Sequence, residues 1–165
     1  MGLVVEDGTG LSNANSYISL ADANTYWIDH GSPSEWDAAT TTEKSAALMY
    51  ATRWLDDNFD WYSYIYTYTQ SLGWPRNTYF DNENRQIDGA TVPQRIKDAT
   101  CELALYHLKD NINSVDNDGV LSEKVGDSSI TYTKSGAQKS FSFLRMSLRQ
   151  YGMAGKSKSN ILYRS

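Results

Sequence analysis

Two histidines and one cysteine are the residues of this chain best suited to nucleophilic or metal chemistry. His30 and His107 lie far apart in the sequence, and neither belongs to a spacing typical of a metal site or a catalytic triad. Cys101 precedes His107 by six residues, which on a helix turns the two side chains about 240° apart. They cannot form a nucleophile–base pair, and we expect a buried thiol and a histidine near a helix end.

Carboxylates are numerous, but their positions do not suggest an acid–base pair. Many of the 20 Asp and Glu fall in segments that favour turns: Asp56, Asp57, Asp81, Glu83, Asp116 and Asp118. A working pair needs environments that separate its two pKa values, which exposed turns do not provide. Residues 113–118 offer oxygen ligands but lack the order and final Glu of an EF-hand. We expect no catalytic residue, no metal, no cofactor and no enzyme.

The segment 62–69 alternates Tyr with smaller residues, and its tyrosines are Tyr62, Tyr64, Tyr66 and Tyr68. As a strand it would place the four rings on one face. Such a face can stack the bases of a single-stranded nucleic acid, or it can contact another protein. Single-strand sites place Lys or Arg beside the rings, but no basic residue lies between Asp60 and Leu72. The pattern therefore favours a protein contact, and nucleic-acid binding is the alternative.

Composition places the chain among single-domain globular proteins. At 165 residues and 40% hydrophobic content it can bury a core. Its net charge of −5 argues against phosphate binding as the main role. The sequence shows no signal peptide and no apolar run near the roughly 18 residues of a membrane span. A single cysteine fits the cytoplasm, and 12 Tyr and 5 Trp suggest surfaces used in assembly.

The elements that must position these residues are mostly helices. Ser19 with Asp22, and Thr40 with Glu43, have capping-box spacing, and Pro93 suits a first helical position. Apolar periodicity then predicts a mainly α fold, a small helical bundle. The predicted helices span 20–30, 41–58, 93–109 and 141–151.

Outside the helices we expect short extended pieces. Residues 123–132 predict a β-hairpin, and residues 3–5 a brief strand that ends in a turn. We assign 1–151 to one helical domain and 152–165 to a flexible basic tail. The tail either orders on a partner or stays disordered, and an apolar anchor near its end could contact a partner: Ile161, Leu162, Tyr163 and Arg164.

Motifs in a fixed order resemble those of a family of small tailed-phage proteins. They cover the chain to about residue 151: Asp7–Gly10, Ala14–Tyr17, Trp61, Gln70–Leu72, Trp74–Arg76, Val92–Pro93, Ala99–Ala104 and Glu123–Gly126. The family is that of head-to-tail adaptors, also called connector or head-completion proteins and also described as DnaT-like single-stranded-DNA-binding proteins. Its signature residues here are Trp61, Gln70, Trp74, Pro75, Arg76 and Pro93.

The resemblance implies a structural virion protein at the neck, assembled in the host cytoplasm. It implies a homo-oligomeric ring, expected as a dodecamer, that binds the portal protein and the next tail or nozzle component. Packaged DNA would pass through the ring without sequence-specific binding, and no membrane is involved. Ser63 and Ile65 stand where the family has Gly and a basic residue. The alternative is a single-stranded nucleic-acid-binding accessory module of replication.

Overall fold

The computed structural model describes residues 2–81, 83–109, 122–125, 128–131 and 142–155. Within these residues the chain is mainly helical, as the sequence predicts. The helices are α1 (Leu20–Asp29), α2 (Ser34–Ala38), α3 (Thr41–Asn58), α4 (Gln94–Lys109) and α5 (Ser142–Leu148). The strands are β1 (Phe59–Trp61), β2 (Tyr79–Phe80), β3 (Gln86–Ile87), β4 (Ser122–Val125), β5 (Ser128–Thr131) and β6 (Gly152–Ala154).

Capping residues start the helices where the sequence predicts. The Ser19 hydroxyl accepts a hydrogen bond from the Asp22 backbone N–H at 3.0 Å and so begins α1. At the start of α3, Thr40 and Glu43 form a complete capping box. These local bonds satisfy backbone N–H groups that no helical carbonyl can reach. Pro93 precedes α4, and its carbonyl accepts the N–H of Ile96.

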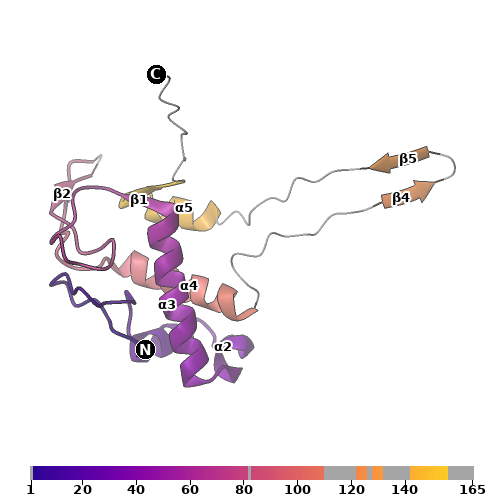
Figure 1. The fold of residues 1–165 in the computed structure, drawn as a ribbon, viewed down its shortest axis with the longest axis horizontal. Helices are drawn as coiled ribbons and strands as arrows, with labels where there is room; N and C mark the ends of the chain where they lie inside the picture. Colours follow the sequence, from indigo (N-terminus) through magenta and orange to yellow (C-terminus); the bar gives the residue numbers. More distant parts are fainter. Residues whose placement is uncertain (1, 82, 110–121, 126–127, 132–141, 156–165) are drawn as a thin grey trace, which may run out of the picture.

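The long helices α3 and α4 pack against each other at the centre of the body, and α1, α2 and α5 pack around α4 (Figure 1). Their contact buries apolar residues such as Leu48 and Leu55 of α3 and Leu103 of α4. All five tryptophans are at most 9% exposed: Trp27, Trp36, Trp54, Trp61 and Trp74. The tryptophans therefore belong to the core, and of the two residue types that suggested assembly surfaces only tyrosine is exposed enough to form one.

Three two-stranded antiparallel sheets complete the fold. The pair β4–β5 forms the hairpin expected near 123–132. The pair β1–β6 joins Phe59 to Ala154 and Trp61 to Gly152, so it ties the end of α3 to the segment after α5. Residues 152–154 were expected in the tail, and they lie in this sheet instead. The residues proposed as the tail's anchor, 161–164, lie outside the described residues.

Two further details differ from the sequence-based expectation. The segment after α1 was expected only to break that helix, but it also forms the short helix α2, which buries Trp36. In α5, Leu144 and Leu148 are buried as expected, whereas Phe143 is 37% exposed. In the part of the chain that the structure describes, no helix combines the length and apolar character of a membrane span.

Candidate contact surface at the tyrosine loop

The segment from Tyr62 to Thr69, here called the tyrosine loop, is not the strand that its alternation predicts. Its regular pairing is limited to an isolated bridge between Ile65 and Arg76, and Ser63 adopts a left-handed φ of 65°. That residue turns the chain and breaks the two-residue period. The rings nevertheless reach the surface, with exposed fractions of 81% for Tyr64, 50% for Tyr66 and 98% for Tyr68.

A half-buried arginine fixes the loop from within. The Arg76 guanidinium donates hydrogen bonds to the carbonyl oxygens of Tyr62 and Ser63, both at 2.6 Å, and of Gly73 at 2.9 Å. Burial lowers the pKa of Arg76, and the nearby Tyr17 and Asp56 oppose that effect. Three of its five N–H donors serve carbonyls, so this cation is engaged in holding the backbone.

Gln70 closes the other end of the loop. Its side-chain oxygen accepts the Thr67 N–H at 2.8 Å, and its amide nitrogen donates to the carbonyls of Leu72 and Pro75 at 2.8 and 2.9 Å. Pro75 follows a cis peptide bond from Trp74. One side chain thus joins three parts of the turn, so the loop carries its exposed rings on a fixed backbone.

Beneath the loop, the carboxylate of Asp56 gathers three donors. It accepts hydrogen bonds from the Tyr17 hydroxyl, from the Trp61 indole N–H at 2.8 Å and from the Gly73 N–H at 2.9 Å. The Trp74 N–H in turn donates to the Tyr17 oxygen at 3.3 Å. This network, here called the Asp56 hub, connects α3, the N-terminal segment and the chain just after the tyrosine loop.

The Asp56 hub also explains why residue 73 is glycine and why the pKa of Tyr17 is raised. A Cβ on Gly73 would lie 2.6 Å from an Asp56 oxygen and 2.6 Å from the Trp61 ring, so a side chain cannot fit there. Tyr17 is fully buried beside the carboxylate. Burial, followed by the charge of Asp56, raises the pKa of Tyr17 well above 10. The phenol therefore stays protonated and donates.

The N-terminal turn supports the loop from below. The buried Glu6 carboxylate accepts the N–H groups of Gly8, Gly10 and Leu11 at 2.9 to 3.0 Å. Leu11 then accepts the Ser71 N–H at 3.1 Å, which ties the turn to the residues after the tyrosine loop. A carboxylate of the chain itself occupies this group of N–H donors, which explains the glycine-rich turn without any phosphate.

The signature residues fall into two places. Trp61, Gln70, Trp74, Pro75 and Arg76 meet around the tyrosine loop, and they shape it and do not face solvent as binding groups. Pro93 lies apart, at the start of α4. Cys101 is a buried free thiol whose pKa is raised by burial, and His107 stacks on Tyr50 near the end of α4. Among the described residues, no three His, Cys, Asp or Glu side chains come together as metal ligands.

Sequence reasoning missed the residues that matter most under the loop. Asp56 was assigned to an exposed turn, but it lies in the last turn of α3 and accepts three bonds. Tyr17 and Glu6 were not singled out, although both are buried. An available signal was that Tyr17 lies two residues before the Ser19 cap, at a fixed place in the family-like motif.

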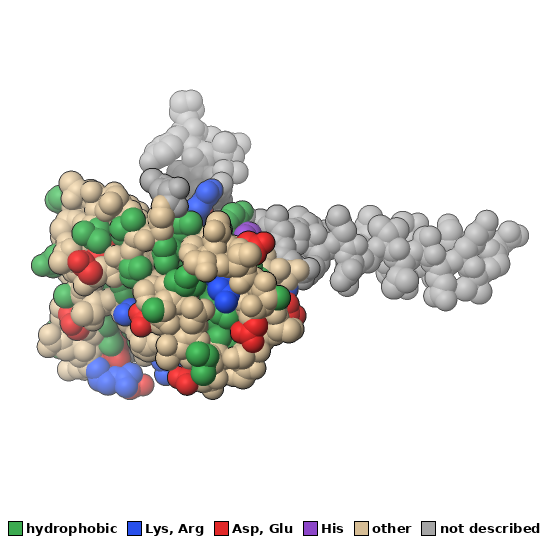
Figure 2. All heavy atoms as spheres, turned by 90° about the horizontal axis from the view of Figure 1, so that it is seen from below, with side chains coloured by type: hydrophobic (Ala, Val, Ile, Leu, Met, Phe, Trp, Pro, Cys, Tyr) green, Lys and Arg blue, Asp and Glu red, His purple; other side chains and the backbone are tan. Residues whose placement is uncertain are grey.

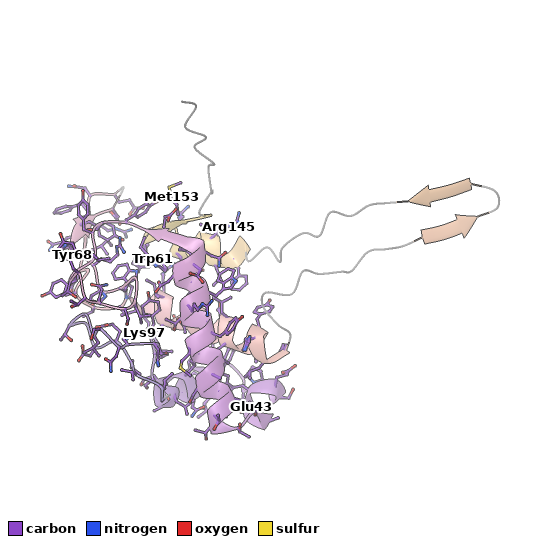
Figure 3. The ribbon with its side chains drawn as sticks, viewed as in Figure 1. Glu43, Trp61, Tyr68, Lys97, Arg145 and Met153 are labelled. Atoms are coloured by element: carbon purple, nitrogen blue, oxygen red, sulfur yellow. The ribbon has the colours of Figure 1, made fainter. Side chains whose placement is uncertain are left out.

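The surface itself is aromatic and free of unpaired charge. Tyr64, Tyr66, Tyr68 and Ile65 line a shallow groove of about 560 Å³ together with Ser63, Arg76 and Asn77. Arg76 is the one cation on that lining, and its guanidinium is bound to carbonyls. Figure 3 shows Tyr68 at the edge of the body, directed away from the helices. Elsewhere cations and anions are interspersed, as on the face seen in Figure 2.

The chain was compared with protein families, curated proteins and solved structures. Residues 1–165 match the family described as "Putative DnaT-like ssDNA binding protein". No curated protein and no solved structure matches the chain.

Proposed function

The chain belongs to this DnaT-like family, and within it we propose that the protein is a structural subunit of a tailed-phage virion, the head-to-tail adaptor. The observation that carries the proposal is the tyrosine loop, where strongly exposed rings stand on a fixed backbone without a free cation. Exposed tyrosine is enriched where proteins meet, and it supplies contact area at low entropic cost.

The fixed backbone strengthens this interpretation. A loop that is already held by Arg76 and Gln70 loses little conformational entropy when a partner covers it. The rings of Tyr64 and Tyr68, at 81% and 98% exposure, would then bury most of their area in the contact. Such a surface is costly to leave open, and a ring of copies would cover it.

The proposed mechanism is geometric. In a ring, one face of each subunit contacts a different face of its neighbour. The tyrosine loop lies at one edge of the body, so it can serve as one of two unlike faces. The ordered motifs that resemble head-to-tail adaptors support the portal and the next tail component as partners, with the ring in the virion neck. The ring would surround packaged DNA and assemble in the host cytoplasm.

The test is to mix the purified protein with the portal ring of its phage and to measure the mass of the complex by native mass spectrometry. We expect a discrete complex with about one copy per portal subunit. The variant Tyr64→Ala/Tyr68→Ala should lose it. The matched control is Ile28→Ala/Phe80→Ala, which truncates side chains that are 70% and 64% exposed. A wild-type protein that never binds the portal would remove the proposal.

The second candidate is single-stranded DNA binding, which the description of the family favours. It predicts an affinity for oligonucleotides that falls steeply with salt. If the tyrosines stack the bases, Tyr64→Ala/Tyr66→Ala should abolish binding. The tyrosine loop offers no free cation to hold phosphates, so a strand would need charge from another part of the chain.

A further inference from the structure

The net charge of −5 hides an uneven division of charge along the chain. Residues 128–165 contain seven Lys and Arg and no Asp or Glu. Residues 1–127 contain eight Lys and Arg against 20 Asp and Glu, so the two parts carry +7 and −12. A division of this kind is typical of proteins with a dedicated surface for a polyanion. The whole-chain charge therefore says little about phosphate binding.

Within the basic part, the structure describes the helix α5 and the residues that follow it. Leu144 and Leu148 anchor α5 in the core, whereas Arg145 and Met146 of α5 and Arg149, directly after it, are exposed. Figure 3 shows Arg145 and Tyr68 at different places on the body. Arg149 lies closer to the start of the tyrosine loop, because it lines a pocket together with Tyr62, Asp81 and Glu83.

Arg145 of α5 and Arg149, directly after it, are free where most other described cations are engaged. Neither Arg145 nor Arg149 forms a hydrogen bond or an ion pair with another described residue. The engaged cations are Arg53 with Asp57, Arg85 with Asp81 and Glu83, Lys109 with Glu35, Arg76 with three carbonyls, and Lys44 over the Trp36 ring. A free, exposed guanidinium is the group that binds a phosphate best.

The same segment also exposes apolar and aromatic side chains. Phe143 is 37% exposed and stacks on Tyr106 of α4, with ring centroids 6.2 Å apart. Met146 and Met153 are 74% and 64% exposed. A single strand is held by guanidinium groups that bind phosphate and by rings that stack bases, and this segment exposes both kinds of group.

We propose that Arg145 of α5 and Arg149, directly after it, bind the phosphate backbone of single-stranded DNA, and that the exposed rings of Tyr64 and Tyr66 do not. This inference rests on the second candidate function and assigns its site. The two arginines carry the site's charge, and the net charge of −12 on residues 1–127 disfavours binding of the strand elsewhere.

The experiment measures binding of a fluorescein-labelled dT20 oligonucleotide to the full chain by anisotropy, at 50 and 200 mM NaCl. The variant Arg145→Gln/Arg149→Gln should bind about tenfold more weakly at 50 mM and should lower the salt slope by about 1.4. The control Arg53→Gln/Arg95→Gln removes the same charge from exposed positions of α3 and α4 and should change little. Equal thermal melting of the variants shows that each still folds.

Four results would overturn the inference. Equal loss in the two double variants would mean that only net charge matters. Loss in Tyr64→Ala/Tyr66→Ala alone would keep single-strand binding but move the site to the tyrosine loop. A third result is self-association in the absence of DNA that Arg145→Gln/Arg149→Gln abolishes. The two arginines would then contact another copy of the chain, whose groove lined by Asp22, Asp29 and Asp98 offers acidic groups. Absence of all oligonucleotide binding would remove the second candidate function as well.

Discussion

Replacing Asp56 by Ala should cost far more stability than replacing its neighbour Asp57 by Ala. The Asp56 carboxylate accepts from the Tyr17 hydroxyl, the Trp61 indole and the Gly73 N–H. Tyr17 and Trp61 are 0% and 9% exposed, so water cannot replace the lost acceptor for them. At about 1–1.5 kcal/mol for each bond, the variant should lose about 3–4 kcal/mol of unfolding free energy.

Asp57 provides the control because it is the same residue type one position later. Its contact is an ion pair with Arg53 at 3.6 Å, and the two side chains are 66% and 79% exposed. Solvent screens such a pair, so Asp57→Ala should cost about 0.5 kcal/mol or less.

Urea unfolding followed by far-ultraviolet circular dichroism gives both unfolding free energies under one condition. Asp56→Asn is a useful intermediate, because it keeps the shape and one oxygen but removes the charge, and we expect it to lose about 2 kcal/mol. If Asp56→Ala and Asp57→Ala lie within 1 kcal/mol of each other, the Asp56 hub does not hold the fold, and the account of how the tyrosine loop is fixed is wrong.

Four other substitutions test separate parts of the structure. Gly73→Ala should destabilise the chain by about 2 kcal/mol or more in urea, because its Cβ would overlap Asp56 and Trp61. Arg76→Lys should speed hydrogen exchange in residues 62–69 while Arg53→Lys does not, since Lys cannot serve three carbonyls. Thr40→Ala should lower the unfolding free energy by about 1 kcal/mol through loss of the α3 cap, measured against Thr41→Ala. The pKa of folded Tyr17 lies above its unfolded value near 10, so its contribution to stability is constant below pH 10 and decreases above it. The urea midpoint of the wild-type protein should therefore decrease above pH 10, and Tyr17→Phe should make that decrease smaller.

The helices could be predicted from the sequence because their signals are local. Ser19 and Thr40 each reach a backbone N–H three residues away, so the spacing in the sequence is already the geometry of the cap. The missed helix α2 has no such signal, since Pro33 makes no side-chain cap and the helix is held by burial of Trp36. Tertiary packing decided that element, and a single sequence does not display packing.

The tyrosine loop shows why a correct pattern gave the wrong element. Alternation predicts a strand only if a partner strand accepts its backbone groups. Here backbone pairing is limited to the bridge around Ile65, and side chains bind other groups of the loop. Arg76 binds the carbonyls of Tyr62 and Ser63, and Gln70 binds the Thr67 N–H. Arg76 and Gln70 are both signature residues of the family-like motifs. Their role depends on contacts across the turn, which propensity and spacing along the sequence do not describe.

The argument from net charge has a limit for a related reason. A net charge of −5 disfavours phosphate binding on average, but an average over the chain cannot describe a surface. A bound DNA strand interacts with the local electrostatic field, and α5 belongs to a part of the sequence that contains no acidic residue. Net charge can exclude a function only when charge is spread evenly, and here it is divided at about residue 127.

The two candidate functions therefore need not compete for one surface. The tyrosine loop is aromatic and without free charge, which suits a protein partner, whereas Arg145 of α5 and the adjacent Arg149 suit a phosphate backbone. A subunit of a ring around DNA has a use for both kinds of surface. A free single-strand binder has no use for a fixed, uncharged tyrosine surface. If only Tyr64→Ala/Tyr68→Ala breaks the portal complex and only Arg145→Gln/Arg149→Gln weakens oligonucleotide binding, the surfaces are independent and the ring interpretation gains from both.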